Sequence, residues 1–578
     1  MKTLLLTLGL GAIGCLAQAT APETVLTNGT IYSLDSKSSV FRRGEVSFAN
    51  GTILCIGAEG ACAKDATDKT RIVNLQGKTV LPGLIDAHAH PIDAGRAMLD
   101  RLNTNRPVML IATNQHNVWL NTRGLRALNI TSATANPPGG RIGKDANGFP
   151  TGVLEENAAG PARALSGDRG ITDLDAAIAG LTVLRQQGFT TILNALATPT
   201  RAWKTLARDN RLTARIFNAF GVFGSLDFDA IAAQARNATQ QLDDGAMVAS
   251  RPGEFWRHVK FFVDGVLPAV SQSAMLVTPY LVNNSNTWVP GTNFGIPGST
   301  SAQLEDLFTK ILGINQGLHL HACGDAGVRQ ILTVAARMNR TFTPSQVAVA
   351  HAELVHPDDL AKFATLGVPA VMSYQWAQKA TYWNEPSRLT LGPERMARTE
   401  PHTGILSAGG LLVYGSDWPV DPLDAFLALK VGVTRSGDAS NRNSHSSFGP
   451  QFVGRLDTQT GLTREQALRG MTVSATTYLE QEKLVGSLEK GKFADIIVTD
   501  RDFLDARAVP DEELGRNRVL LTLLGGRPVW ANATWVPQDW TATAKALEDT
   551  AIAQRLNTRN ILPRSISGRQ CQHGSHEY

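Results

Sequence analysis

Hydrophobic and polar residues follow a strand-and-helix rhythm through the middle of the chain. Short apolar runs recur there, and longer stretches with helical spacing, such as 174–187 and 301–315, lie between most of them. The strand candidates are 85–87, 190–194, 214–219, 259–263, 318–321, 347–350, 370–373 and 411–414. Eight strands alternating with helices predict a TIM (β/α)8 barrel, an α/β fold whose chemistry lies at the C-terminal ends of its strands.

The two ends of the chain have a different pattern, in which short strands alternate with glycine-rich turns. The candidates are 24–27, 30–33, 44–48 and 53–56 near the start, and 494–498, 519–524 and 527–529 near the end. We therefore predict a small β-sandwich domain assembled from residues 20–80 and 481–540, around a barrel formed by residues 81–480. Residues 104–165 interrupt the barrel rhythm and predict an inserted cap. Residues 541–578 predict a C-terminal helix and a loose tail.

Composition narrows the class of protein. The chain has 578 residues, of which 43% are hydrophobic and 18% charged, so it can bury a large core. Its net charge of +4 is small for this length and argues against nucleic acid or a charged membrane surface as the main partner. We expect a small-molecule substrate, and a homodimer remains open.

The N-terminus predicts export. Met1-Lys2, an apolar run over 4–16 and the small-x-small site Ala17-Gln18-Ala19 are typical of a signal peptide spanning residues 1–19. The alternatives are a buried N-terminal helix and a lipid anchor on Cys15. Cys55 and Cys62 are close enough to close a small loop by a disulfide in an oxidising compartment. Asn-x-Ser/Thr sequons, consistent with a secreted and N-glycosylated protein, begin at Asn28, Asn50, Asn129, Asn237, Asn283, Asn339 and Asn532.

The first barrel strand ends in a His-x-His pair, His88 and His90. Residues two apart on a strand point the same way, so the two imidazoles can converge on one metal ion. The alternative is a structural pair on a core strand.

Four further strand ends carry groups of the same kind. They are Lys260, His321, His351 and Asp417. The order His-x-His, Lys, His, His, Asp matches a two-metal hydrolase site, in which the ions lie about 4 Å apart. A lysine can join such a site only as a carbamate, because an ammonium has no lone pair to give. Asp417 can take a proton from water and return it to the leaving group. Without this pattern, Lys260 would be read as an ordinary strand lysine.

The complete set of motifs resembles the amidohydrolase superfamily, in particular the branch of N-substituted formamide deformylases and YtcJ-like proteins. The resemblance covers nearly the whole chain after residue 19 and rests on segments 81–90, 259–265, 321–325, 351–359, 415–419 and 486–495. It implies one or two divalent ions, with zinc favoured, a carboxylated Lys260, and the ligands His88, His90, Lys260, His321, His351 and Asp417. It also implies that His116 binds substrate or stabilises an oxyanion.

Two departures affect the pocket. Only residues 91–105 separate the His-x-His from the Arg106-Pro-Val segment, fewer than in the family, and Gln375-Trp-Ala-Gln378 lacks the histidine that relatives often have after strand seven. We predict a secreted hydrolase of a non-peptide C–N bond in an amide or formamide. A non-catalytic barrel protein and a metal-dependent deaminase or esterase are the alternatives, because a fold does not fix a function.

Other polar and aromatic residues have plainer interpretations. His319 orients a neighbour or packs, His356 and His402 lie in surface loops, and Asp325 caps a helix. Glu155 is either a pocket acid or a solvated hairpin residue. Trp376, Trp383 and Trp418 pack as ordinary aromatics or line an apolar pocket.

Overall fold

The computed structural model describes residues 21–90, 109–111, 116–120, 122–145, 148–165, 172–222, 225–268, 271–338, 342–532 and 535–547. The predicted signal peptide, the segment 91–105, the sequon at Asn339 and most of the predicted tail lie outside these ranges. The described residues contain no helix long and apolar enough to cross a membrane.

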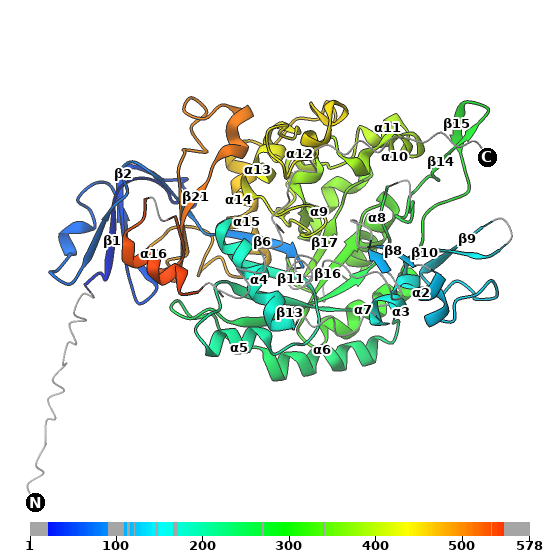
Figure 1. The fold of residues 1–578 in the computed structure, drawn as a ribbon, viewed down its shortest axis with the longest axis horizontal. Helices are drawn as coiled ribbons and strands as arrows, with labels where there is room; N and C mark the ends of the chain where they lie inside the picture. The colour runs from blue at the N-terminus through cyan, green and yellow to red at the C-terminus, as the bar shows by residue number, and fades with distance from the viewer. Residues whose placement is uncertain are drawn as a thin grey trace, which may run out of the picture.

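Eight parallel strands form the central barrel (Figure 1). They are β6 (Leu84–Ala89), β11 (Phe189–Ala197), β12 (Arg215–Gly221), β13 (Glu254–Phe262), β16 (Gly317–Ala322), β17 (Val347–His351), β18 (Ala370–Met372) and β19 (Leu412–Tyr414). Each strand pairs with the next in chain order, and the parallel bridge between Ala89 and Trp418 brings the first and last strands together. All eight predicted strands overlap these elements, so the predicted TIM barrel is confirmed.

Amphipathic helices cover the barrel. In α7 (Ser301–Leu312), the buried residues Leu304, Leu307, Phe308 and Ile311 follow the helical repeat. The Thr300 hydroxyl accepts from the backbone of Gln303, whose side chain accepts in turn from the backbone of Thr300, which closes a capping box. The other covering helices are α4 (Asp173–Gln186), α5 (Ala202–Arg208), α6 (Phe228–Leu242), α8 (Asp325–Arg337), α9 (Leu360–Leu366), α12 (His402–Ser407), α13 (Ala425–Thr434) and α14 (Arg464–Gly470).

A short helix contributes to the barrel interior. Inward residues from the strands, among them Ile85, Phe217 and Val413, form one apolar cluster with Tyr478 and Leu479 at the end of α15 (Val473–Tyr478). The interior is therefore a packed core, and Tyr478 is part of it.

Both ends of the chain build a second sheet, which lies beside the barrel in Figure 1. Its main path runs β22-β21-β20-β5-β1-β2-β3, with β4 paired to β1. The strands are β1 (Thr24–Tyr32), β2 (Val40–Ala49), β3 (Thr52–Gly57), β4 (Arg71–Asn74), β5 (Thr79–Pro82), β20 (Ile496–Thr499), β21 (Val519–Leu524) and β22 (Arg527–Ala531). The helix α16 (Gln538–Lys545) packs on this sheet through Trp540 and Ala544. The expected β domain from both ends is confirmed; its helix begins at Gln538, before the predicted 541.

The predicted insertion contains an antiparallel sheet in the order β7-β8-β10-β9. Its strands are β7 (Met109–Ile111), β8 (Asn117–Leu120), β9 (Gly140–Lys144) and β10 (Pro150–Glu156), followed by α3 (Gly160–Leu165). A separate hairpin, β14 (Leu281–Asn284) and β15 (Thr287–Pro290), lies between β13 and α7.

Cys55 and Cys62 form a disulfide, as their spacing suggested. The six sequon asparagines in described residues are exposed or partly exposed. Secretion and glycosylation stay predictions.

Candidate metal centre

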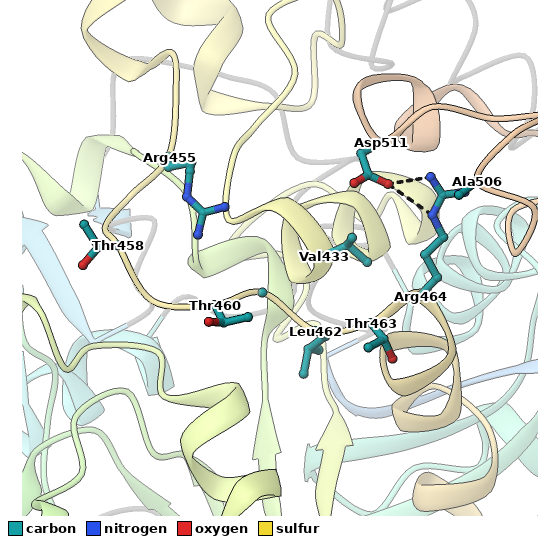
Figure 2. A pocket seen from close by; sticks show the side chains of 10 residues that line it. Val433, Arg455, Thr458, Thr460, Leu462, Thr463, Arg464, Ala506 and Asp511 are labelled. Atoms are coloured by element: carbon teal, nitrogen blue, oxygen red, sulfur yellow. Dashed lines mark hydrogen bonds and ion pairs between the residues drawn. The ribbon is translucent and has the colours of Figure 1, made fainter.

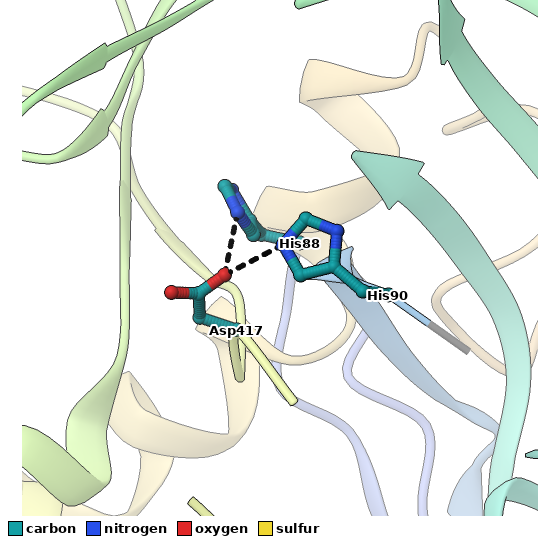
Figure 3. Close-up of side chains that lie close together, drawn as sticks. All are labelled: His88, His90 and Asp417. Carbon is teal, nitrogen blue, oxygen red and sulfur yellow. Dashed lines mark hydrogen bonds and ion pairs between the residues drawn. The ribbon is translucent and has the colours of Figure 1, made fainter. Parts of the chain in front are cut away.

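Three side chains converge at the point where the barrel closes (Figure 3). His88 Nε2 lies 2.8 Å from Asp417 Oδ1, and His90 Nε2 lies 2.9 Å from the same oxygen. Their potential ligand atoms all lie within 4.8 Å of one another. His88 and His90 come from the end of β6, and Asp417 follows β19, so the two strands that meet at the closure supply all three groups.

Asp86 fixes this junction. Its carboxylate accepts from the backbone N–H groups of Ser416 (2.8 Å) and His88 (3.1 Å), and also from the Ser416 hydroxyl. Two backbone hydrogen bonds, Asp417 N–H to the His88 carbonyl (2.6 Å) and His90 N–H to the Trp418 carbonyl (2.8 Å), complete the closure. Asp417 also has a left-handed backbone (φ 53°), which costs energy for a non-glycine residue and turns the chain sharply after the strand.

Two more predicted ligands lie against the same cluster. The His351 ring centroid is 4.6 Å from that of His88 and 4.5 Å from that of His321. Burial lowers the pKa of all three histidines well below the usual value, so they are neutral, which is the form that binds metal.

Lys260, on β13, is 1% exposed, and its ammonium interacts electrostatically with Asp417. Burial lowers the pKa of Lys260 to about 8, while Asp417 and Cys323 act in the opposite direction. The amine is therefore neutral more often than that of an ordinary lysine, and carbamate formation requires the neutral amine.

Unpartnered atoms test whether these residues fit a metal ion. Although His88 Nε2 lies close to Asp417, it has no aligned hydrogen-bond partner among the described residues, and neither has His321 Nδ1. His321 Nε2 donates to the Gly265 carbonyl (2.9 Å), which leaves the lone pair on Nδ1. Buried nitrogen lone pairs without a hydrogen donor, grouped with a carboxylate, fit divalent cation ligands such as those of zinc.

His116 reaches the cluster from the inserted sheet. Its ring centroid is 4.7 Å from that of His321, and its Nδ1 lies 2.7 Å from Glu156 Oε2. The Ser273 hydroxyl donates to the other Glu156 oxygen (2.6 Å) and accepts from the Val266 N–H (3.1 Å). All seven predicted site residues therefore gather at one end of the barrel.

Sequence reasoning missed several acids and a cysteine in this region. Asp264, two residues after β13, accepts from the backbone N–H groups of Cys323, Gly324 and Met275. Asp264, His321 and Cys323 form a second group of possible ligands, but these hydrogen bonds give Asp264 a structural role. Burial raises the pKa of the Cys323 thiol, so it stays protonated, and raises the pKa of Glu353 to about 7.

Two of the plainer interpretations were wrong. His402 is 1% exposed rather than on the surface, because it begins α12 against the Tyr374 ring. Asp325 does not cap α8, since Gly324 occupies that position and Asp325 accepts instead from the Val277 N–H (2.8 Å). Glu155 is buried and paired with Arg141, so it is not a solvated hairpin residue.

A surface pocket of about 580 Å³ lies elsewhere, between the end of α13 and the start of α14 (Figure 2). Arg464 on its wall pairs with Asp511, and Arg455 donates to the carbonyls of Thr434 and Gln459. None of the predicted ligands lines this pocket.

A TIM barrel with histidines and a carboxylate at the C-terminal ends of its strands has the arrangement of a metal-assisted hydrolase. Comparison with known families identifies the chain more closely: it belongs to the amidohydrolase family, whose model matches residues 92–530.

Curated relatives share the overall length. The chain is 23% identical to N-substituted formamide deformylase from Arthrobacter pascens, over 87% of this chain and 97% of the relative. It is 24% identical to the putative amidohydrolase YtcJ from Bacillus subtilis, over 75% of each. It is also 23% identical to the protein LONG AFTER FAR-RED 3 from Arabidopsis thaliana, over 88% and 91%. The predicted branch is confirmed.

Solved structures share the fold. An uncharacterised metal-dependent hydrolase from Pyrococcus horikoshii matches with a TM-score of 0.63 at 19% identity, over 83% of this chain and 98% of that one. A triazine hydrolase variant matches with a TM-score of 0.54 at 15% identity, over 94% and 99%.

Proposed function

We propose that this protein is a metal-dependent hydrolase of a C–N bond other than a peptide bond, in a small amide or formamide. The observation that carries the proposal is the convergence of His88, His90 and Asp417 on one point, with His321 and His351 beside them. The full-length similarity to a formamide deformylase supports the choice of bond.

The donor set suits one or two divalent ions. His88, His90 and Asp417 would hold one, His321 and His351 would hold a second, and a carboxylated Lys260 would lie between them. Such an ion supplies Lewis acidity and makes water more acidic.

The protein's own groups do the remaining work. Burial would raise the pKa of Asp417, but the hydrogen bond from His90 holds that pKa below its usual value. Its carboxylate is therefore ionised, so that it can accept a proton from water and pass it to the leaving nitrogen. His116, oriented by Glu156, hydrogen-bonds the oxygen of the substrate carbonyl as negative charge develops on it.

Replacing the proton acceptor tests this proposal. Asp417→Asn keeps the size of the side chain but removes the basic oxygen, so turnover of an amide or formamide substrate should fall by at least about 10²-fold. Circular dichroism should show a folded barrel. Full activity in the folded variant would overturn the mechanism.

Elemental analysis of the purified wild-type protein separates the alternatives. One or two divalent ions per chain support the proposed centre. A folded protein that takes up no divalent ion, even after incubation with zinc, would instead support a non-catalytic barrel protein. A substrate panel that includes esters and amino-substituted heterocycles distinguishes amide hydrolysis from the related esterase and deaminase activities.

A further inference from the structure

A chain of buried hydrogen bonds runs from the candidate metal centre to α15. His88 Nδ1 lies 2.8 Å from His319 Nε2, and His319 Nδ1 lies 2.7 Å from the Tyr478 hydroxyl. The three side chains are 2%, 0% and 1% exposed. Solvent therefore does not compete for these hydrogen bonds.

This chain determines which nitrogen His88 presents to a metal. A neutral imidazole carries one proton, so a ring that offers the lone pair of one nitrogen must donate from the other. In the tautomer that leaves the Nε2 lone pair of His88 free, Nδ1 of His88 donates to Nε2 of His319. The remaining nitrogen, Nε2, faces Asp417 Oδ1 at 2.8 Å, the point shared with His90.

Tyr478 plays the same part for His319. When His319 accepts at Nε2, its own proton is on Nδ1 and is donated to the Tyr478 oxygen. Tyr478 is held in place by the apolar cluster inside the barrel and by the His258 ring, 5.2 Å away. Two hydrogen bonds, between Tyr478 and His319 and between His319 and His88, thus connect α15 to the candidate metal centre.

We propose that His319 and Tyr478 are positioning residues, which hold the ring and tautomer of His88 so that its Nε2 binds a divalent cation. The inference rests on the proposed metal centre. Partners of metal-bound histidines typically change metal affinity by about 10- to 100-fold when they are removed.

Metal affinity measures this role without relying on activity. Metal-free wild-type protein and its variants are titrated with Zn²⁺ in competition with a chromogenic chelator. Tyr478→Phe, which removes one oxygen, should weaken binding of the most tightly bound ion by about 10-fold. His319→Leu should weaken it by up to about 100-fold. His319→Gln, whose amide can still accept from His88, should recover part of the loss.

A matched control separates this effect from the loss of any buried hydroxyl. The Tyr374 hydroxyl is buried and has no hydrogen-bond partner among the described residues. Tyr374→Phe should therefore leave zinc affinity unchanged. The visible spectrum of bound Co²⁺ gives a second readout, since it should change in Tyr478→Phe and not in Tyr374→Phe.

The outcomes are distinguishable. If wild-type protein binds no zinc, the proposed function fails and the inference with it. If wild-type protein binds zinc, but Tyr478→Phe binds it as tightly and gives the same Co²⁺ spectrum, only the positioning inference is overturned. Should His319→Leu fail to fold, the Tyr478→Phe and His319→Gln pair still decides the question.

Discussion

In the proposed centre, Lys260 lies between two ligand groups. One consists of His88, His90 and Asp417, and the other of His321 and His351. It is buried among the predicted ligands, yet its free amine cannot bridge cations in the ammonium form. Lys260→Ala should therefore reduce the metal content from two ions per chain to one or none. The loss in kcat/KM should be at least the roughly 100-fold that removal of an outer partner can cause.

The measurement for Lys260 is elemental analysis beside a rate assay. Lys430, on α13, provides a control, because it is also buried but donates to the Ser436 and Gly437 carbonyls just after that helix. Lys430→Ala should keep its metal. Two ions in Lys260→Ala would exclude a bridging carbamate.

At the residue scale, the sequence predicted those site residues whose relation is local, such as two histidines on one strand. His88 and His90 point together because they are two apart, a relation that is local. The same rule makes His319 and His321 equivalent, so only the family resemblance could choose between them. Glu156 and Tyr478 were missed because their partners, His116 and His319, are 40 and 159 residues away, and no local pattern encodes such contacts.

At the scale of elements, β10 connects the inserted sheet to the catalytic end of the barrel. Its last residue, Glu156, has a left-handed backbone (φ 51°) and contacts both His116 and Ser273. Glu156→Gln replaces the carboxylate that orients His116 by a neutral amide. We expect kcat to fall by about 10- to 100-fold, with a smaller change in KM, because His116 acts on charge that develops in the transition state.

Glu155, next to Glu156 on β10, provides a control for a general disturbance of the inserted sheet. Glu155 pairs with Arg141 and not with His116, so Glu155→Gln should have a much smaller effect on kcat. Steady-state kinetics of the two variants on one substrate makes the comparison. Equal losses would indicate a general effect on the insertion and no special role for Glu156.

The barrel strands could be predicted because each is a short apolar run at its expected place in the alternation. The ends of the strands were predicted less well. β13 begins at Glu254, five residues before the predicted start, because polar residues in its first half interrupt the apolar pattern. The insertion was recognised only as an interruption. Its sheet depends on pairings such as Leu154 with Val118 and Ile142, which side-chain patterns over so few residues do not specify.

At the scale of the whole molecule, a buried ion pair connects the barrel to the β domain. Arg215 on β12 donates to both oxygens of Asp495, at 2.8 and 2.9 Å, and both side chains are almost fully buried. Asp495 also accepts from the Gly525 N–H, between β21 and β22 (2.8 Å). Arg215 further donates to the Val248 and Ala249 carbonyls. One guanidinium thus links the barrel, a loop and the residue directly before β20 of the second sheet.

Removing one partner of this pair should destabilise the molecule strongly. Asp495→Asn leaves the Arg215 guanidinium buried without a counter-charge, which typically costs about 3–5 kcal/mol. The urea midpoint of unfolding should fall accordingly. In the double variant Arg215→Met, Asp495→Leu the loss should be smaller than in Asp495→Asn, because no charge is left buried. If Asp495→Asn unfolds at the wild-type midpoint, the pair does not hold the domains together, and their apolar contacts, such as Ile497 and Val519 against the barrel cluster, must do so alone.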